Sequence, residues 1–219
     1  MMIDAHLTSA EKVILGLRAA IISGSYAAGE QIRQEKIAAE FNVSRMPVRE
    51  AFRQLEAEGL LVVFPGRGTY VNRLSNEEVI EICDIRILLE CDAIRRAVPK
   101  LRQTDLLEAE HLLQKMMQAE APHSFGKLDQ AFHETLYAPT NRGRLLELIR
   151  TLRNQVTQFL YAASTLDSFR PSAIEDHKNI LIACQAGDIE SAVDAVKTHL
   201  QNAVIQITSA SDYANSTDL

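Results

Sequence analysis

The feature that most restricts the fold of this chain is a β-hairpin pattern at residues 60–71, in a sequence that otherwise follows helical periodicity. Residues 60–64 are apolar and include β-branched side chains, Pro65 and Gly66 open a turn, and residues 69–71 form a second strand. Helices are expected before this hairpin at about 9–22, 34–41 and 45–59, with a short extended segment near residues 29–32. This order of elements predicts a winged helix-turn-helix.

The chain after the hairpin has the pattern of successive amphipathic helices. Capping boxes at Thr8–Glu11, Ser75–Glu78 and Ser172–Glu175 mark three helix starts, because each places a hydroxyl three residues before a glutamate. The expected fold is mostly α, with a winged helix-turn-helix of three helices and a β-hairpin wing at residues 1–73, and an all-α antiparallel bundle of six or seven helices at residues 74–219. Helices in the second part are predicted at about 76–97, 104–119, 124–137, 142–164, 172–185 and 188–209.

Charge is divided unevenly between these two parts. The whole chain carries a net charge of −6, yet residues 1–73 hold nine Lys and Arg against eight Asp and Glu, whereas residues 74–219 hold fourteen against twenty-one. The acidity therefore belongs to the second part. A nearly neutral first part can bind nucleic acid only if its positive side chains gather on one face.

Composition also bears on location. The chain has no stretch of roughly 18 uninterrupted apolar residues and no basic start leading into an apolar run, so we expect neither a membrane span nor a signal peptide. The three cysteines, Cys83, Cys91 and Cys184, show no CxxC pairing and indicate reduced thiols. A cytoplasmic protein without a membrane partner is expected.

The third expected helix carries an arginine pattern suited to DNA. Arg45, Arg49 and Arg53 recur every four residues and so lie on one side of the helix. An arginine near the N-terminus of a helix in the major groove can bind guanine O6 and N7 with both ends of its guanidinium. The alternative is a solvated arginine face, and spacing alone leaves both interpretations open.

Residues 31–60 resemble the signature of the GntR family of transcriptional regulators. The core SRMPVREA at residues 44–51, the ending LEAEGL at 55–60 and the wing PGRGTYV at 65–71 carry the resemblance, which covers residues 8–73. It implies binding of a double-stranded DNA operator. The sequence departs from the family pattern at Met46, where the family commonly has threonine and a hydroxyl able to contact a base.

The resemblance also assigns roles to individual residues of the first part. Arg33, Arg45 and Arg49 are implied to contact the operator, and Gly66 of the wing to enter the minor groove. We expect Arg53 and Arg67 to contact phosphates, which position the protein without specifying a sequence.

Four residues of the second part form a candidate metal site. Asp129 and His133 are four residues apart and project from one helix face, while His177 and His199 lie in two later helices. One carboxylate with three imidazoles suits Zn, Ni, Co or Mn and leaves positions open for a ligand. The long separations leave open the alternative that each histidine is simply packed or exposed.

The order and spacing of these residues within 75–208 resemble the FadR-type effector domain, called FCD. The pattern comprises Asp129, His133, Asn141, Asp176, His177, Gly187 and His199. The resemblance implies that Asp129, His133, His177 and His199 hold a divalent metal ion (Zn, Ni or similar). It further implies that a small organic acid binds in the same cavity, with Asn141 among its contacts. The branch of the family that responds to fatty acyl-CoA lacks this metal set.

Arginines provide further candidates in the second part. Arg86 lies one turn before Glu90 and is predicted to bind a carboxylate effector, or alternatively to form a surface ion pair with Glu90. A solvated face is expected for the remaining group, Arg142, Arg144, Arg150 and Arg153.

Together these features predict a metabolite-responsive repressor and not an enzyme. A homodimer on a palindromic operator is expected, because one winged domain contacts too little DNA for useful specificity. A metal-dependent, hydrolase-like enzyme that activates a metal-bound water with the Asp/His set is the first alternative. No nucleophile motif, phosphate loop or evident general base accompanies that set. A regulator with a purely structural metal is the second alternative.

Overall fold

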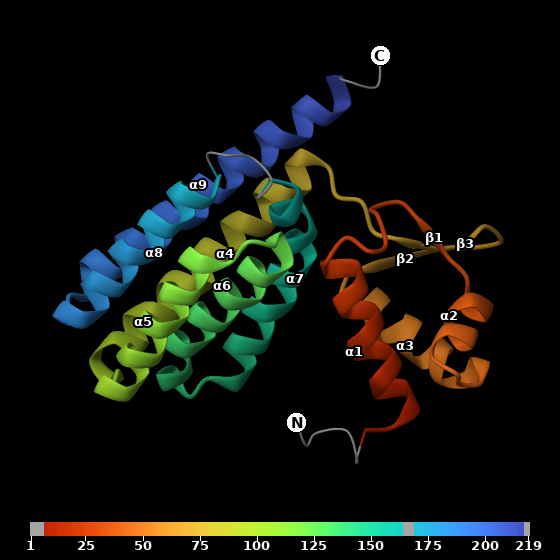
Figure 1. Cartoon of the computed structure of the whole chain (residues 1–219), viewed down its shortest axis with the longest axis horizontal. Helices are drawn as coiled ribbons and strands as arrows, with labels where there is room; N and C mark the ends of the chain where they lie inside the picture. The colour runs from red at the N-terminus through yellow and green to blue at the C-terminus, as the bar shows by residue number, and fades with distance from the viewer. Residues whose placement is uncertain (1–6, 164–168, 217–219) are drawn as a thin grey trace. The chain divides into compact units, whose positions relative to one another are not determined.

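The structure is a computed structural model that describes residues 7–163 and 169–216 of the 219-residue chain. The chain divides into two compact units, residues 1–74 and 75–219 (Figure 1). Helices dominate both units, and the strands belong to the first, as the mostly α prediction requires.

The first unit is a winged helix-turn-helix built around one apolar core. Its helix α1 begins at the predicted capping box, in which the Glu11 amide donates to Thr8 Oγ1 at 3.2 Å and the Thr8 amide donates to the Glu11 carboxylate at 2.7 Å. The buried face of α1 packs against that of α3, where Phe52 and Leu55 lie in the core. The elements are α1 (Ser9–Ile22), β1 (Gln31–Ile32), α2 (Gln34–Glu40), α3 (Arg45–Ala57), β2 (Leu61–Phe64) and β3 (Gly68–Val71).

The wing is a three-stranded antiparallel sheet in the order β1-β3-β2. The predicted hairpin is formed by β2 and β3, and the expected extended segment joins it as β1 by pairing Gln31 with Tyr70. Gly66 in the turn has a φ of 74°, a left-handed conformation that glycine adopts without steric cost. A Cβ at Gly66 would meet nothing within 4 Å, so backbone conformation rather than crowding favours glycine here.

The second unit is a bundle of α-helices. Within the described residues it contains six α-helices and two short 3-10 helices, in agreement with the six or seven predicted. Its helix α4 begins at the predicted box of Ser75 and Glu78. The other elements are η1 (Val98–Lys100), α5 (Gln103–Gln118), α6 (Pro122–Tyr137), η2 (Ala138–Thr140), α7 (Gly143–Ala163), α8 (Phe169–Ala186) and α9 (Ile189–Ser216), after α4 (Asn76–Ala97).

Two predicted boundaries in this unit are wrong. Ser172 lies inside α8, which already begins at Phe169, so its box does not start a helix. Helix α9 continues to Ser216, beyond the expected end near residue 209. The helix predicted at about 142–164 corresponds to α7, and its expected end at residue 164 lies outside the described residues.

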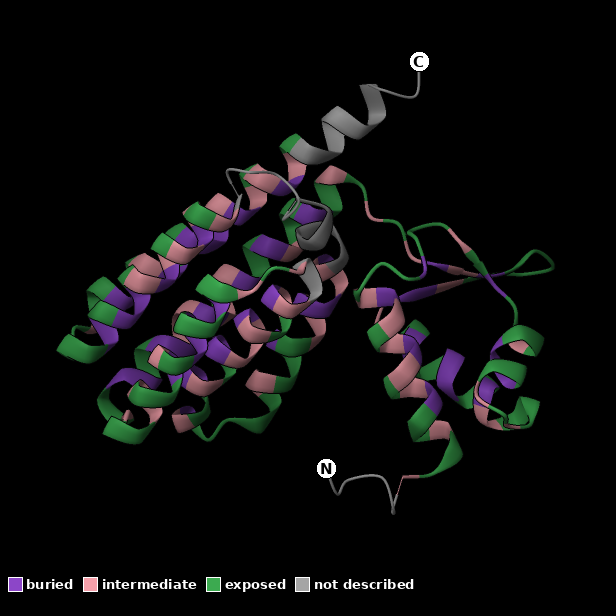
Figure 2. Ribbon diagram, viewed as in Figure 1, coloured by how far each residue is buried: buried purple, intermediate pink, exposed green. Residues whose placement is uncertain are grey.

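Packing brings helices distant in sequence together. Helix α4 packs against α9, α7 and α6, while α8 packs against both α9 and α5 (Figure 1). Buried residues lie on the faces where these helices meet (Figure 2). None of the helices in the described part of the chain is long and apolar enough to cross a membrane.

Candidate metal centre and DNA-binding surface

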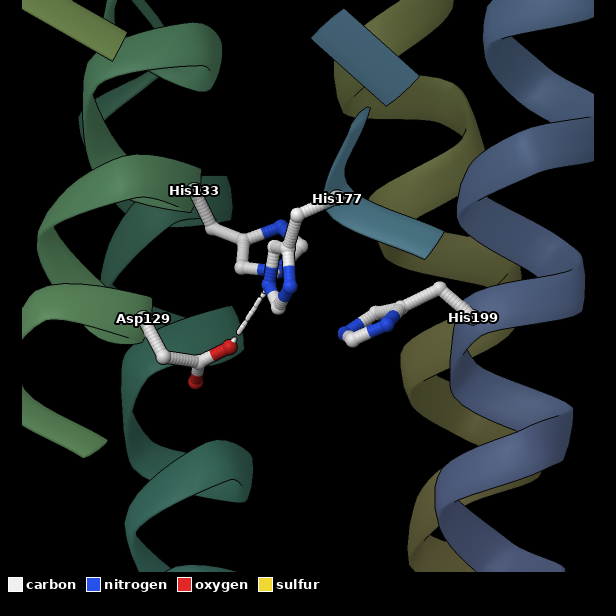
Figure 3. A group of neighbouring side chains, drawn as sticks. All are labelled: Asp129, His133, His177 and His199. Carbon is white, nitrogen blue, oxygen red and sulfur yellow. Dashed lines mark hydrogen bonds and ion pairs between the residues drawn. The ribbon is translucent and has the colours of Figure 1, made fainter. Parts of the chain in front are cut away.

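The four predicted metal ligands converge inside the helical unit. Asp129 and His133 lie on α6, His177 on α8 and His199 on α9, and all four side chains are buried (Figure 3). Each offers one ligand atom, and these atoms all lie within 4.8 Å of one another. The spacing of Asp129 and His133 places them on one helix face, and the packing of α8 on α9 supplies the other two.

The spacing of the donor atoms fits a single cation. His177 Nε2 lies 2.8 Å from Asp129 Oδ1 and 3.2 Å from His133 Nε2. His133 Nε2 lies 3.8 Å from Asp129 Oδ1. Four ligands bound tetrahedrally at about 2.0–2.1 Å would have donor atoms roughly 3.3 Å apart. The separations among Asp129, His133 and His177 bracket this value, and a ligand atom of His199 lies within 4.8 Å of the others, so the four residues could hold a divalent metal such as Zn or Ni.

Contacts behind the ligands orient two of the imidazoles. His177 Nδ1 contacts the backbone oxygen of Ala173, so the N–H on Nδ1 donates there and Nε2 is the nitrogen that faces the other ligands. His133 Nδ1 lies 3.2 Å from the hydroxyl of Tyr137, which donates to Glu90 Oε2 at 3.0 Å. Such partners fix the ring orientation of metal-binding histidines.

A carboxylate lies next to the third imidazole, that of His199. Its Nδ1 is buried without a hydrogen bond, and the carboxylate of Asp176 lies 3.6 Å away. Asn202 holds that carboxylate with contacts of 3.1 and 3.2 Å. The carboxylate of Asp176 thus lies beside Nδ1 of His199, where a carboxylate partner can orient a metal-binding imidazole.

The protonation states favour cation binding. Burial lowers the pKa of His133 well below its usual value, and the positive charge of Arg153 lowers it further. Burial also lowers the pKa of His199, with His177 adding to the effect. Burial opposes ionisation of Asp129, but Arg153 and His177 outweigh it and hold the pKa of that carboxyl well below its usual range. The neutral form of His133 and His199 and the ionised form of Asp129, which these shifts favour, are the forms that bind metals.

Arg153 is buried beside the candidate metal site, and the prediction that it lies on a solvated face is wrong. It is 5% exposed, and its Nη2 donates to Asp129 Oδ2. Ile149 and Val156, four residues before it and three after it, are both buried. Arg153 therefore interrupts an apolar stripe of α7, and this position is the signal that would have identified it.

Arg86 is also buried, which corrects the expectation of a surface ion pair. Its Nε donates to Glu90 Oε1 at 2.8 Å, so the predicted partner is right and the predicted exposure is wrong. Arg86, Arg153, Asp129 and His199 line one cavity with an empty volume of about 610 Å³, part of it open to solvent. The cavity therefore combines two candidate metal ligands with two buried guanidinium groups.

Asn141 does not lie in this cavity. It is exposed, ends η2 with a φ of 56°, and lines a separate surface pocket with Lys100 and Asp105. Asparagine tolerates the left-handed conformation better than most residues, so its position is explained by the end of η2. The expectation that Asn141 contacts a ligand at the metal group is not supported by this placement.

The six predicted DNA contacts all lie on the exposed surface of the first unit. Arg45, Arg49 and Arg53 are exposed along one side of α3, and Arg45 forms an exposed ion pair with Glu35 at 3.3 Å. Arg33 immediately precedes α2. The remaining two, Gly66 and Arg67, lie in the turn of the wing.

Side chains of the sheet hold the turn of the wing in place. The backbone oxygen of Arg67 accepts from Gln31 Nε2 at 3.0 Å and from the Tyr70 hydroxyl at 3.1 Å. The rings of Phe64 and Tyr70 pack edge to face, with centroids 5.5 Å apart. Strand β1 thus supports the wing as well as extending the sheet.

A winged helix-turn-helix with an exposed arginine face, joined to a helical unit, defines a DNA-binding transcriptional regulator. Residues 9–71 match the model of the bacterial regulatory proteins of the gntR family, and residues 81–202 match that of the FCD domain. The chain belongs to the GntR family, in its FadR-type branch with an FCD domain. Its relatives are regulators and not enzymes, so the hydrolase alternative is set aside.

Individual relatives agree with this assignment. The HTH-type transcriptional repressor RspR of Escherichia coli strain K12 is 30% identical over 188 residues, which cover 84% of this chain and 82% of RspR. A GntR transcriptional regulator from Rhodococcus sp. RHA1 is 28% identical, with a TM-score of 0.78 over 92% of this chain and 98% of that one. McbR/YncC of E. coli shares the fold, with a TM-score of 0.84 at 24% identity over 93% of this chain and 99% of that one.

Proposed function

We propose that this regulator is a repressor that binds a palindromic operator as a homodimer and responds to a small carboxylate at a divalent metal ion. The observation that carries the proposal is the buried convergence of Asp129, His133, His177 and His199 beside a cavity that also contains buried arginines. A divalent metal bound there would supply open coordination positions for a carboxylate.

For the DNA-binding unit, we infer that Arg45 and Arg49 contact base edges from the N-terminal half of α3. Both are exposed, whereas Val48 and Phe52 of the same helix pack in the core. The inferred remaining contacts are Arg33 to the operator, Gly66 to the minor groove, and Arg53 and Arg67 to phosphates.

An exposed apolar face on α4 supports the homodimer. Ile80, Ile85 and Leu88 are 41%, 40% and 73% exposed, and they lie within one side of the helix. A two-fold axis would place the same face of a second copy against it and would present two winged units to a palindrome.

Leu88→Glu is expected to convert the dimer to a monomer, because a two-fold axis would bring two carboxylates together in an apolar interface at a cost of several kcal/mol. Sedimentation velocity would measure the change in mass. Ile182→Glu is the matched control, since Ile182 on α8 is 61% exposed and lies on another helix. A Leu88→Glu protein that stays dimeric would show that this face is not the interface.

The experiment that tests the ligand response is operator binding by the metal-loaded protein, with the operator selected from a random duplex library. Fluorescence anisotropy would follow the titration in the presence of acetate, glycolate or succinate. We expect at least one of these acids to change operator affinity by about 5- to 150-fold, the usual range of allosteric coupling. A metal that stabilises the fold while none of the acids alters operator affinity would instead support a purely structural metal.

A further inference from the structure

The two terminal nitrogens of the Arg153 guanidinium have different surroundings within the helical unit. Its Nη2 donates to Asp129 Oδ2, whereas the other oxygen of that carboxylate, Oδ1, faces His177. Its Nη1 is buried and has no hydrogen-bond partner. A guanidinium has five N–H donors and cannot lose its charge, so a buried Nη1 without an acceptor carries a free-energy cost.

The same guanidinium lies beside open space. Arg153 lines the cavity that it shares with Arg86 and His199, and it also lines a second cavity with His133 and Tyr137. Among the acidic groups nearby, Glu90 is engaged by Arg86 and Tyr137, and Asp129 is engaged by Arg153 Nη2 and His177. An anionic ligand in the cavity would supply the acceptor that Nη1 lacks.

Charge makes such an anion favourable for the metal as well. Arg153 orients Asp129, which favours metal binding, but its positive charge lies next to the place of a divalent cation and opposes it. A carboxylate on Nη1 would cancel this repulsion while leaving Nη2 on Asp129. Coulomb interactions of buried charges are weakly screened, so the effect is felt at the metal group.

We propose that Arg153 couples the metal site to the ligand cavity, with Nη2 positioning Asp129 as a metal ligand and Nη1 binding a carboxylate. This inference rests on the proposed function of the metal site and adds to it the residue through which the two binding events communicate. Because binding free energies are linked reciprocally, the carboxylate raises metal affinity by the same factor as the metal raises carboxylate affinity.

Calorimetric titration of Ni²⁺ into the full-length, metal-free protein tests the coupling, with and without excess acetate as the probe. Wild type is expected to bind Ni²⁺ at least about fivefold more tightly in acetate. Arg153→Lys keeps one charge that can meet Asp129 but loses the second arm, so we expect Ni²⁺ binding without acetate and no enhancement by it. Arg153→Met removes both arms and is expected to show no enhancement either.

Arg144→Met is the matched control for these variants. Arg144 also lies on α7, is exposed, and lines neither of the two cavities, so this variant should retain the full acetate enhancement. If acetate does not enhance Ni²⁺ binding by wild type, or if the enhancement persists in Arg153→Lys, the coupling through Arg153 is refuted while the metal site still stands. A folded wild type that binds no Ni²⁺ overturns the metal site itself and the coupling with it.

Discussion

Removal of metal by a chelator is expected to lower the melting temperature of this protein by about 10 °C, and Zn²⁺ or Ni²⁺ added back should restore it. The donor atoms come from α6, α8 and α9 and meet only when these helices pack. A metal ion that binds only the folded state adds about 4 kcal/mol of stability at a thousandfold excess over its dissociation constant. In a chain of this size, each kcal/mol changes the melting temperature by roughly 2–4 °C.

The double variant Asp129→Ala/His199→Ala should melt at the same temperature with and without metal, because it removes two of the four ligands. His111→Ala is the matched control, since His111 is an exposed histidine on α5 that lies outside the group. Differential scanning calorimetry would give both values. A wild-type protein whose melting temperature ignores Zn²⁺ and Ni²⁺ alike would refute the metal site, although the DNA-binding assignment would stand.

The parts of the fold that can be predicted correctly depend on local chemistry. The capping boxes at Thr8 and Ser75 start helices because the hydroxyl and the glutamate satisfy each other's amides within four residues. The hairpin at residues 61–71 follows from β-branched segments around a glycine turn. The box at Ser172 fails because the same local pattern can lie within a helix that begins earlier, here at Phe169.

The candidate site depends on packing, which periodicity does not specify. The spacing of Asp129 and His133 puts both on one face of α6, but only the packing of α8 and α9 brings His177 and His199 to them. At the level of the sequence, only the resemblance to the FCD pattern predicts that these four residues lie together. Arg153 is missed because a charged residue is usually solvated, whereas here Asp129 compensates its burial.

Replacement of Arg49 by alanine is expected to weaken operator binding about 5- to 150-fold for each half-site, which corresponds to the roughly 1–3 kcal/mol of a bidentate bond to guanine. Arg45→Ala should have a similar effect, reduced if its ion pair with Glu35 competes with DNA in the free protein. Binding to unrelated duplexes should change much less, because base contacts specify the sequence and phosphate contacts do not. Anisotropy titrations on operator and scrambled duplexes would measure both affinities.

Arg53→Ala is the control that separates base reading from general attraction to DNA. Without the guanidinium of Arg53 to bind a phosphate, affinity should fall for operator and scrambled duplexes alike, and the slope of log affinity against log salt should decrease by about one for each phosphate released. Arg49 and Arg53 are both exposed and lie one turn apart on α3, so the two substitutions should have similar effects on the stability of the fold. If Arg49→Ala lowers affinity for both duplexes equally, then Arg49 binds phosphate and the operator sequence is read by other residues.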